Sequence, residues 1–501
     1  MKKTLIYLIL LLIFIGISPI IGNKIVEYYV EEEIVEVRKK GITLNFKGET
    51  AGYLYTSRQY EFILTDVDAF ARYLTEYGAG MLPPYTEDLL KSIVFRLDMK
   101  YHNIPFLEPI SIDIYPMYIS DGIMNKLKGS GNIFFEKFEK FIMSQGLLYH
   151  IDYNLLSENY KGHIKNIDYK ERGYDGSNII LTLHNAVFNG TGSFSTSSSL
   201  QADVDKIMLK TSDTSKDVTL EINKFSSQSS VSVSEKAEEL YDKSKELYEK
   251  TKDMYEDSDL PEHIETVQEK SEDTVRQMYD TSMKMKSMFF NTKDKDSDKE
   301  TTIEVENADV NISSEQGNKK SKNRSYFFFE SLNLKTKEIN VEMSEILYSA
   351  SMSNIDTASF QELQSLLAQA KSSPSVDVLS DLKVSAINLL SRGFKMQIPE
   401  LSVQNIHFEG EDLGGLKLIS AFNVKEDKNL AAKMLFSPLF IVKNIDFKLH
   451  LKVSKKIYTK FVQEVPLALL AMVATKQTKN DLIYDVSYIN GNLKVNGNTV
   501  L

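Results

Sequence analysis

The sequence predicts an α+β protein rich in β-structure, with elongated antiparallel sheets, short helices, an inserted α-helical hairpin and an N-terminal transmembrane helix. Three observations support this fold class. An uncharged apolar run extends from Leu5 to Gly22, apolar and polar residues alternate from about residue 42, and three similar heptads occupy residues 239–259. Strict alternation is typical of strands that have one covered and one solvated face.

The first element is the apolar run, which follows Lys2 and Lys3. As a helix it would be roughly 27 Å long, close to the thickness of the hydrocarbon core of a bilayer. Its end lacks the Ala-x-Ala pattern of a cleaved signal peptide, which is the alternative interpretation. We therefore expect residues 1–23 to be an uncleaved signal anchor. Because positive charge stays on the cytoplasmic side, the chain is expected in a bacterial inner membrane as a single-pass protein whose bulk is periplasmic.

The composition restricts the function classes. The 501 residues carry a net charge of −11, which argues against nucleic acid as a partner. Cysteine is absent, so disulfides, thiol catalysis and cysteine-ligated metals are excluded. A hydrophobic content of 42% is sufficient for real cores.

Residues 24–233 are predicted to form a β-rich domain, because period-two patterns recur along this range. In each of them apolar side chains occupy every second position. The clearest examples are residues 93–101, 110–114, 149–155 and 179–183.

The middle of the chain has a different pattern. Leu240, Leu247 and Met254 recur at heptad spacing, and a second apolar pattern with spacings of three, four and seven continues to Phe289. We interpret residues 234–290 as an α-helical hairpin that packs on itself, on the β-body or on a partner helix. Residues 291–325 are rich in Lys, Asp, Ser and Asn and are predicted to be a polar flexible segment, with a short strand at 303–305 as the alternative.

Residues 326–501 are predicted to be a β-rich C-terminal domain. Apolar residues alternate cleanly over 445–453, and helices are expected after Ser375 or Asp377 and after Ser454. Asn490-Gly491 lies between two alternating runs, which favours a type I′ hairpin that pairs Tyr488 with Leu493 and Val486 with Val495.

Several segments of this last third resemble a known family. They are the helix-to-strand transition over residues 388–402, the glycine-containing stretch over 409–415, the helix after Ser454 and the closing hairpin over 488–497. With the N-terminal anchor, they resemble the YdgA family of bacterial envelope proteins, which is defined by a domain of unknown function. The resemblance is best over residues 380–501 and implies no catalytic residue. A more distant fold-level analogy, to AsmA-type proteins, implies long sheets that handle lipid.

No catalytic, cofactor-binding or metal-binding residue is predicted, because no chemical motif is complete. Gly129-Ser-Gly131 and Gly190-Thr-Gly192 lack the remainder of a phosphate-binding loop and are interpreted as turns. Asp294, Asp296 and Asp298 resemble the start of a calcium loop but lack its glycine and its final glutamate, so they are interpreted as a solvated charge run. No two of the seven histidines have the sequence spacing of metal ligands. We therefore interpret all seven as residues on the polar faces of strands or at their edges: His102, His150, His163, His184, His263, His407 and His450.

Two further features leave alternatives open. Asp309-Val-Asn311-Ile-Ser313 fits an extended bacterial glycosylation sequon, so Asn311 is a candidate modification site. With 70 Asp and Glu residues, a pair of distant carboxylates is also available for hydrolysis.

The function expected is a non-enzymatic structural, adaptor or lipid-handling role in the cell envelope, without a cofactor. An envelope hydrolase is the alternative. The expected partners are the membrane, a lipid ligand, and either a second copy of the chain or another helix at the 234–290 hairpin.

Overall fold

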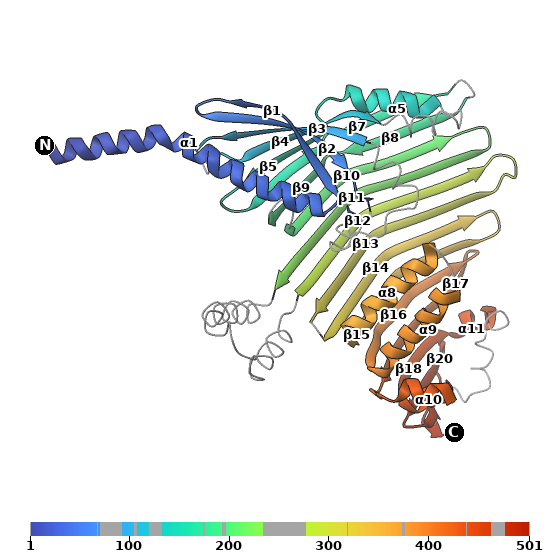
Figure 1. The fold of residues 1–501 in the computed structure, drawn as a ribbon. Helices are drawn as coiled ribbons and strands as arrows, with labels where there is room; N and C mark the ends of the chain where they lie inside the picture. The colour runs from blue at the N-terminus through green and yellow to red at the C-terminus, as the bar shows by residue number, and fades with distance from the viewer. Residues whose placement is uncertain are drawn as a thin grey trace, which may run out of the picture. The chain divides into compact units, whose positions relative to one another are not determined.

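The structure is a computed structural model that describes residues 2–67, 69–70, 93–104, 108–119, 133–173, 176–192, 197–233, 277–317, 319–372, 376–436, 438–461 and 476–499. It is β-rich, with a long antiparallel sheet and a few short helices (Figure 1). The chain divides into two compact units. Unit 1 comprises residues 1–230 and 285–300, and unit 2 comprises residues 231–284 and 301–501.

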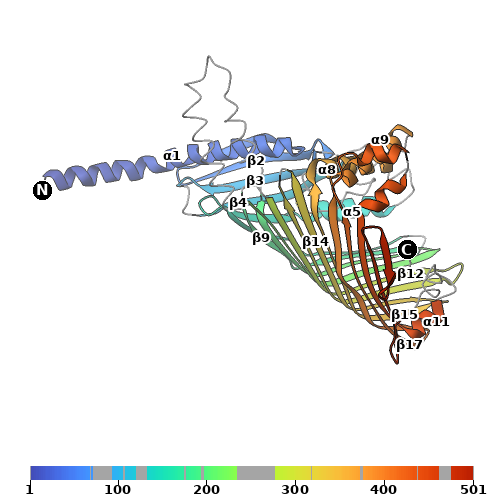
Figure 2. The same ribbon diagram turned by 90° about the horizontal axis from the view of Figure 1, so that it is seen from below.

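Unit 1 begins with helix α1, which extends over Lys2–Lys39. The predicted anchor ends at residue 23, whereas α1 continues to Lys39, so residues 24–39 of the predicted β-rich domain are helical. Val26, Val30 and Val37 are buried at helical spacing, whereas Tyr28 and Val35 are exposed on the other side. A helix continues here because one of its faces has a sheet to pack against. Figure 2 shows the second half of α1 along the sheet near β2 and β3.

The residues outside α1 supply the strands of unit 1, which pair antiparallel in the order β1–β2–β3–β4–β5–β6–β9–β10–β11. The second half of β10 instead pairs with β8, and β8 pairs with β7. The second half of β12 lies beside β11, since the amide of Asn223 donates to the hydroxyl of Ser287 (3.1 Å). The bounds are β1 Ile42–Ala51, β2 Tyr55–Leu64, β3 Ile93–His102, β4 Ile110–Ile119, β5 Tyr149–Asn154, β6 Asn159–Ile164, β7 Ile167–Arg172, β8 Asn178–His184, β9 Ala186–Gly192, β10 Ser197–Ser212, β11 Lys216–Val233 and β12 Gln277–Asp294.

The core of unit 1 lies between α1 and strands β2 to β5. Its buried members are Val26, Val30, Tyr60, Leu97, Tyr101, Ile110, Ile112 and Ile151. Polar contacts hold α1 in register above them. The hydroxyl of Tyr101 donates to the side-chain oxygen of Asn23 (2.7 Å), and the buried guanidinium of Arg58 contacts Glu27 (3.1 Å) and Glu49 (2.8 Å). A buried cation requires such partners, so these two carboxylates also stabilise the docked helix.

Burial raises the pKa of Tyr101 to about 12, whereas an unfolded tyrosine titrates near 10. The protonated hydroxyl of Tyr101 therefore contributes its full stabilisation below about pH 10. This stabilisation is lost as the pH rises to about 12. We expect wild-type protein to lose up to about 2–3 kcal/mol more stability over this range than Tyr101→Phe, which has no hydroxyl to titrate. Urea unfolding followed by circular dichroism between pH 9 and pH 12 measures the difference. Parallel curves for the two proteins would contradict the prediction.

Two glycines in unit 1 lie under aromatic rings of the neighbouring strands. Gly162 pairs with Phe188, and Gly190 pairs with Tyr160. A Cβ atom at Gly162 would lie 2.2 Å from the carbonyl oxygen of His150 and 2.2 Å from the ring of Phe188. Such pairs fill the space above a glycine with the ring opposite. The prediction that Gly190-Thr-Gly192 is a turn is wrong, because these residues end β9. Residues 129–131 lie outside the described residues.

A line of polar residues crosses unit 1 at the short connections between β6 and β7 and between β8 and β9. Asn185 has a φ of 50°, donates from its backbone N–H to Asn166 (2.8 Å), and donates from its amide to Asp205 (2.8 Å). Lys224, with a φ of 53°, donates to the same carboxylate (2.6 Å). Hydrogen bonds from Asn185 and Lys224 lower the pKa of Asp205. These contacts satisfy the backbone where the regular strand pattern is interrupted.

The strands of unit 2 pair antiparallel in the order β13–β14–β15–β16–β17–β18–β20–β21–β22, with β19 on β20. The first four are unusually long. The bounds are β13 Glu300–Gln316, β14 Lys320–Thr336, β15 Asn340–Asp356, β16 Phe394–Phe408, β17 Glu411–Val424, β18 Ile445–Ser454, β19 Lys476–Gln477, β20 Asp481–Ile489, β21 Asn492–Val495 and β22 Asn498–Thr499.

Short helices complete the described architecture. In unit 1, α5 (Ile133–Ser144) packs Phe141 on Tyr169 of β7, with ring centroids 4.9 Å apart. In unit 2, α8 (Thr357–Ser372) packs on α9 (Val376–Ser391), and both lie beside β15 and β16 in Figure 1. The remaining helical elements are α10 (Leu430–Phe436), the 3-10 helix η1 (Pro438–Asn444) and α11 (Lys455–Phe461).

The local predictions for the C-terminal third are confirmed where the structure describes them. The register of β20 and β21 pairs Tyr488 with Leu493 and Val486 with Val495. Asn490 and Gly491 have φ angles of 51° and 84°, as a type I′ turn requires. The hydroxyl of Ser454 accepts the backbone N–H of Ile457 (3.2 Å) and so caps α11.

The middle of the chain corrects two predictions. The predicted 234–290 hairpin is wrong over 277–290, because these residues belong to strand β12; residues 234–276 lie outside the described residues. The prediction that residues 291–325 are flexible is also wrong. This range contains the last residues of β12, the whole of β13 and the first residues of β14. Methionine and lysine favour a helix over 278–289, but cross-strand pairing overrides this local preference.

No helix in the described part of the chain is long and apolar enough to cross a membrane. The side chains of residues 2–17, which contain most of the predicted anchor, lie outside that part.

Candidate functional site

One face of the sheet in unit 2 is apolar across several strands, and we call it the apolar face. Residues that are paired across antiparallel strands project to the same face, so the register defines its rows. Two rows cross strands β13 to β16, and two continue to β20. They are Ile303–Leu334–Val341–Phe408, Val305–Leu332–Met343–Ile406, Ala308–Phe329–Ile346–Val403–Leu416–Val453–Leu482 and Val310–Phe327–Tyr348–Leu401–Leu418–Leu451–Tyr484.

The apolar rows remain on one face because the backbone of two strands departs locally from regular β conformation. Asn307 in β13 and Glu345 in β15 have φ angles of 46° and 47°. In β13 this conformation shifts the alternation by one residue, so that Val305 and Ala308 are both buried while the intervening Glu306 and Asn307 are exposed. The amide of Asn307 donates to the carboxylate of Glu330 on β14. Without the shift, strict alternation would place the two halves of each strand on opposite faces.

The apolar face is covered unevenly by the described elements. Near its β18–β20 end, Val453, Leu482 and Tyr484 are buried and pack with Ile457 and Tyr458 of α11. Over β14 and β15, by contrast, Phe327, Phe329 and Ile346 remain only half-buried. Seven strands at about 4.8 Å spacing give the longest rows a length of roughly 29 Å. The rows are long enough for an extended acyl chain to lie across the strands.

The opposite face of the same sheet is mainly polar and carries cross-strand ion pairs. Glu400 contacts Lys417 (2.8 Å), and Lys452 contacts Asp481 (3.0 Å). His450 bonds Asp485 through Nδ1 (2.6 Å), and this hydrogen bond lowers the pKa of Asp485. The sheet of unit 2 is thus amphipathic, with chemically distinct sides.

The histidines occupy structural positions in the described residues. His150 bonds Asp113 on the neighbouring strand (2.6 Å), His184 bonds Asp168 (2.8 Å), and Nδ1 of His102 accepts the backbone N–H of Ile104 (3.0 Å). The rings of His150 and His163 lie 5.3 Å apart, and His407 lies in β16. His263 lies outside the described residues. Within the described ranges, no group of three or more His, Asp or Glu residues could hold a metal ion.

The two other candidates from the sequence lie in or beside β13. The carboxylate of Asp294 accepts the backbone N–H groups of Asp296 (3.0 Å) and Ser297 (2.8 Å), so it stabilises the turn after β12. The bond from Ser297 contributes most to lowering the pKa of Asp294. Asn311 lies within β13, pairs with Tyr326 and donates to Asp309 (2.8 Å). The sequon therefore lies in a regular strand, and not in a flexible segment as the prediction for residues 291–325 implied.

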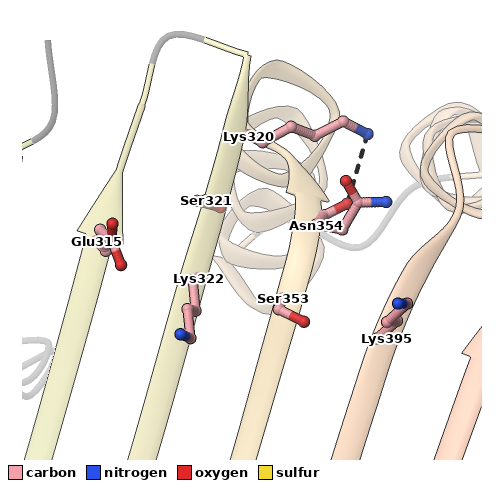
Figure 3. Close-up of a pocket in the computed structure, with 7 residues that line it drawn as sticks. All are labelled: Glu315, Lys320, Ser321, Lys322, Ser353, Asn354 and Lys395. Carbon is pink, nitrogen blue, oxygen red and sulfur yellow. Dashed lines mark hydrogen bonds between the residues drawn. The ribbon is translucent and has the colours of Figure 1, made fainter. Parts of the chain in front are cut away.

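Two clefts formed by described residues of unit 2 are relevant to function. The larger has a volume of about 530 Å³ and is lined by Glu315, Lys320, Ser321, Lys322, Ser353, Asn354 and Lys395 (Figure 3). The smaller, of about 90 Å³, is lined by two carboxylates, Asp280 and Glu315, and by Lys322 and Arg324 among others. It contains two carboxylates, but it is smaller than the roughly 300–1,000 Å³ typical of ligand pockets.

Sequence reasoning predicted none of these cleft residues. Their common signal is a run of alternating cations at 320, 322 and 324, which is visible in the sequence but becomes a site only when Lys395 is added from another strand. Comparisons of this chain with protein families, with curated proteins and with solved structures found no match.

Proposed function

We propose that this chain is a membrane-anchored envelope protein that holds lipid acyl chains against the apolar face of unit 2, in a non-enzymatic role. The N-terminal apolar run supports the anchor, with the bulk of the chain on the periplasmic side of a bacterial inner membrane. The resemblance of residues 380–501 to the YdgA family and the analogy to AsmA-type proteins are consistent with this proposal.

The observation that carries the proposal is the continuity of the apolar rows from β13 to β20. A β-protein core needs apolar residues only where a second layer covers them, yet Phe327, Phe329 and Ile346 are half-buried. Contiguous apolar area of this kind is typical of binding surfaces in soluble proteins. Acyl chains fit it well because the hydrophobic effect is non-directional and scales with buried area.

The proposal predicts that lipid binding depends on one face of β14. Phe327 and Phe329 lie on the apolar face, whereas Tyr326 and Phe328 alternate with them on the opposite face. We expect the double variant Phe327→Gln/Phe329→Gln to lose half or more of its lipid, because two apolar contacts become polar. The full-length chain is extracted from native membranes, and its phospholipid content is measured by mass spectrometry and by uptake of a fluorescent phospholipid.

The matched control is Tyr326→Gln/Phe328→Gln, which removes two aromatic rings from the same strand. Lipid around the N-terminal anchor is common to all the variants and cancels in the comparison. Equal lipid content in the two double variants would refute the proposal. It would also be refuted if the wild-type protein took up no more phospholipid than the Phe327→Gln/Phe329→Gln variant. Binding of a partner through residues 234–276 stays a separate prediction.

A further inference from the structure

The larger cleft of unit 2 is formed by four consecutive strands of the sheet, and we call it the basic cleft. Glu315 lies near the end of β13, Lys320 and Lys322 lie in the first residues of β14, Ser353 and Asn354 lie near the end of β15, and Lys395 is the second residue of β16. In Figure 3, Ser353 lies between Lys322 and Lys395 on adjacent strands. The volume of about 530 Å³ is within the range of clefts that hold small ligands.

The charge of the basic cleft is opposite to that of the chain. Three lysines and one glutamate line it, although the chain carries 59 basic and 70 acidic residues. Asp356 interacts electrostatically with Lys320, and it also accepts hydrogen bonds from the backbone N–H (3.0 Å) and the hydroxyl (2.7 Å) of Ser359. Cations gathered on neighbouring strands repel one another, so an anion between them would stabilise the arrangement.

The backbone at the basic cleft departs from regular sheet geometry. The register between β14 and β15 shifts between Ser321 and Asn323, and Asn354 has a φ of 61°. Lys320 Nζ lies 3.4 Å from the carbonyl oxygens of both Asn354 and Arg392. Bulges redirect side chains and are common beside functional sites. Here the irregularity places the hydroxyl of Ser353 in the cleft, next to its paired neighbour Lys395.

We propose that the basic cleft binds a phosphoryl group. Lys322 and Lys395 lie on strands two spacings apart, roughly 10 Å, and their flexible side chains can converge on an anion between them. Their ammonium groups donate charge-assisted hydrogen bonds to the phosphoryl oxygens, and the hydroxyl of Ser353 donates a further one. The group belongs either to a phospholipid headgroup or to a small phosphorylated solute. The inference does not depend on the apolar face.

The experiment titrates the full-length chain in a non-ionic detergent with two probes. Inorganic pyrophosphate represents the free solute, and mixed micelles with phosphatidic acid, compared with phosphatidylcholine, represent the headgroup. Isothermal titration calorimetry should show saturable binding of at least one anionic probe. Lys322→Gln and Lys395→Gln should each weaken that binding about tenfold or more, because each removes a charged donor. Lys335→Gln, an exposed position at the other end of β14, is the matched control and should leave binding unchanged.

The outcomes separate the two sources. Lysine-dependent binding of pyrophosphate alone assigns a soluble ligand, binding of phosphatidic acid alone assigns a lipid headgroup, and binding of both assigns the phosphoryl group itself. Absence of saturable binding, or equal effects of Lys322→Gln and Lys335→Gln, would overturn the proposal. Melting temperatures of the variants close to that of the wild type show that lost binding does not reflect unfolding.

Discussion

Replacement of Leu97 by alanine is expected to lower the free energy of unfolding of unit 1 by about 2–5 kcal/mol. Leu97 is 2% exposed and lies in the cluster that joins α1 to strands β2 to β5. It pairs with Tyr60 on one side and Ile114 on the other, so the surrounding sheet has little freedom to fill the cavity. Chemical denaturation of the full-length chain, followed by circular dichroism, measures the change.

The matched control for this prediction is Leu156→Ala. Leu156 lies between β5 and β6 and is 66% exposed, so its truncation should change stability by no more than about 0.5 kcal/mol. If the two leucine variants unfolded at the same denaturant concentration, the packing of α1 on the sheet described above would be incorrect.

The second large effect is expected at Gly162, where alanine should destabilise unit 1 by about 1–3 kcal/mol. A Cβ atom there would lie 2.2 Å from the backbone oxygen of His150, and a backbone atom cannot move without disturbing the β5–β6 pairing. The same atom would displace the ring of Phe188, which stacks on Tyr149 with centroids 4.8 Å apart. Thermal unfolding with a near-ultraviolet signal from these aromatic rings detects both consequences.

Gly48→Ala is the control for this substitution. Gly48 lies in β1, and no atom lies within 4 Å of a Cβ built on it. Its replacement should be neutral or slightly stabilising, because alanine reduces the freedom of the unfolded chain. A Gly162→Ala protein as stable as Gly48→Ala would show that the aromatic ring does not occupy the space above Gly162.

Elements controlled by neighbouring residues were predictable from the sequence. Asn490-Gly491 specifies its turn type through two positive φ angles, and this sets the register of the hairpin. Ser454 caps the helix that follows it, and the alternation over 445–453 marks β18. Each of these signals acts over a few residues, so these elements can be predicted without knowledge of the tertiary structure.

Strands β12 and β13 were not predictable by the same reasoning. Cross-strand pairing, of β12 beside β11 and of β13 with β14, compensates for helix-forming methionines in β12 and for a polar composition in β13. In β13 only every second residue needs to be apolar, and the positive φ of Asn307 interrupts even that pattern. The continuation of α1 beyond residue 23 has a similar origin, because the sheet on which Val26 and Val30 pack consists of residues 55–154.

The sequence by itself determined the β-rich class, the apolar N-terminal run, the absence of thiol chemistry and the geometry of the C-terminal hairpin. These follow from composition, from short-range periodicity and from backbone preferences of single residues. Only the tertiary structure decided that the apolar positions of β13 to β20 share one face and that Lys322 and Lys395 line one cleft. Cross-strand register brings such residues together, and register depends on contacts between residues that are distant in the chain.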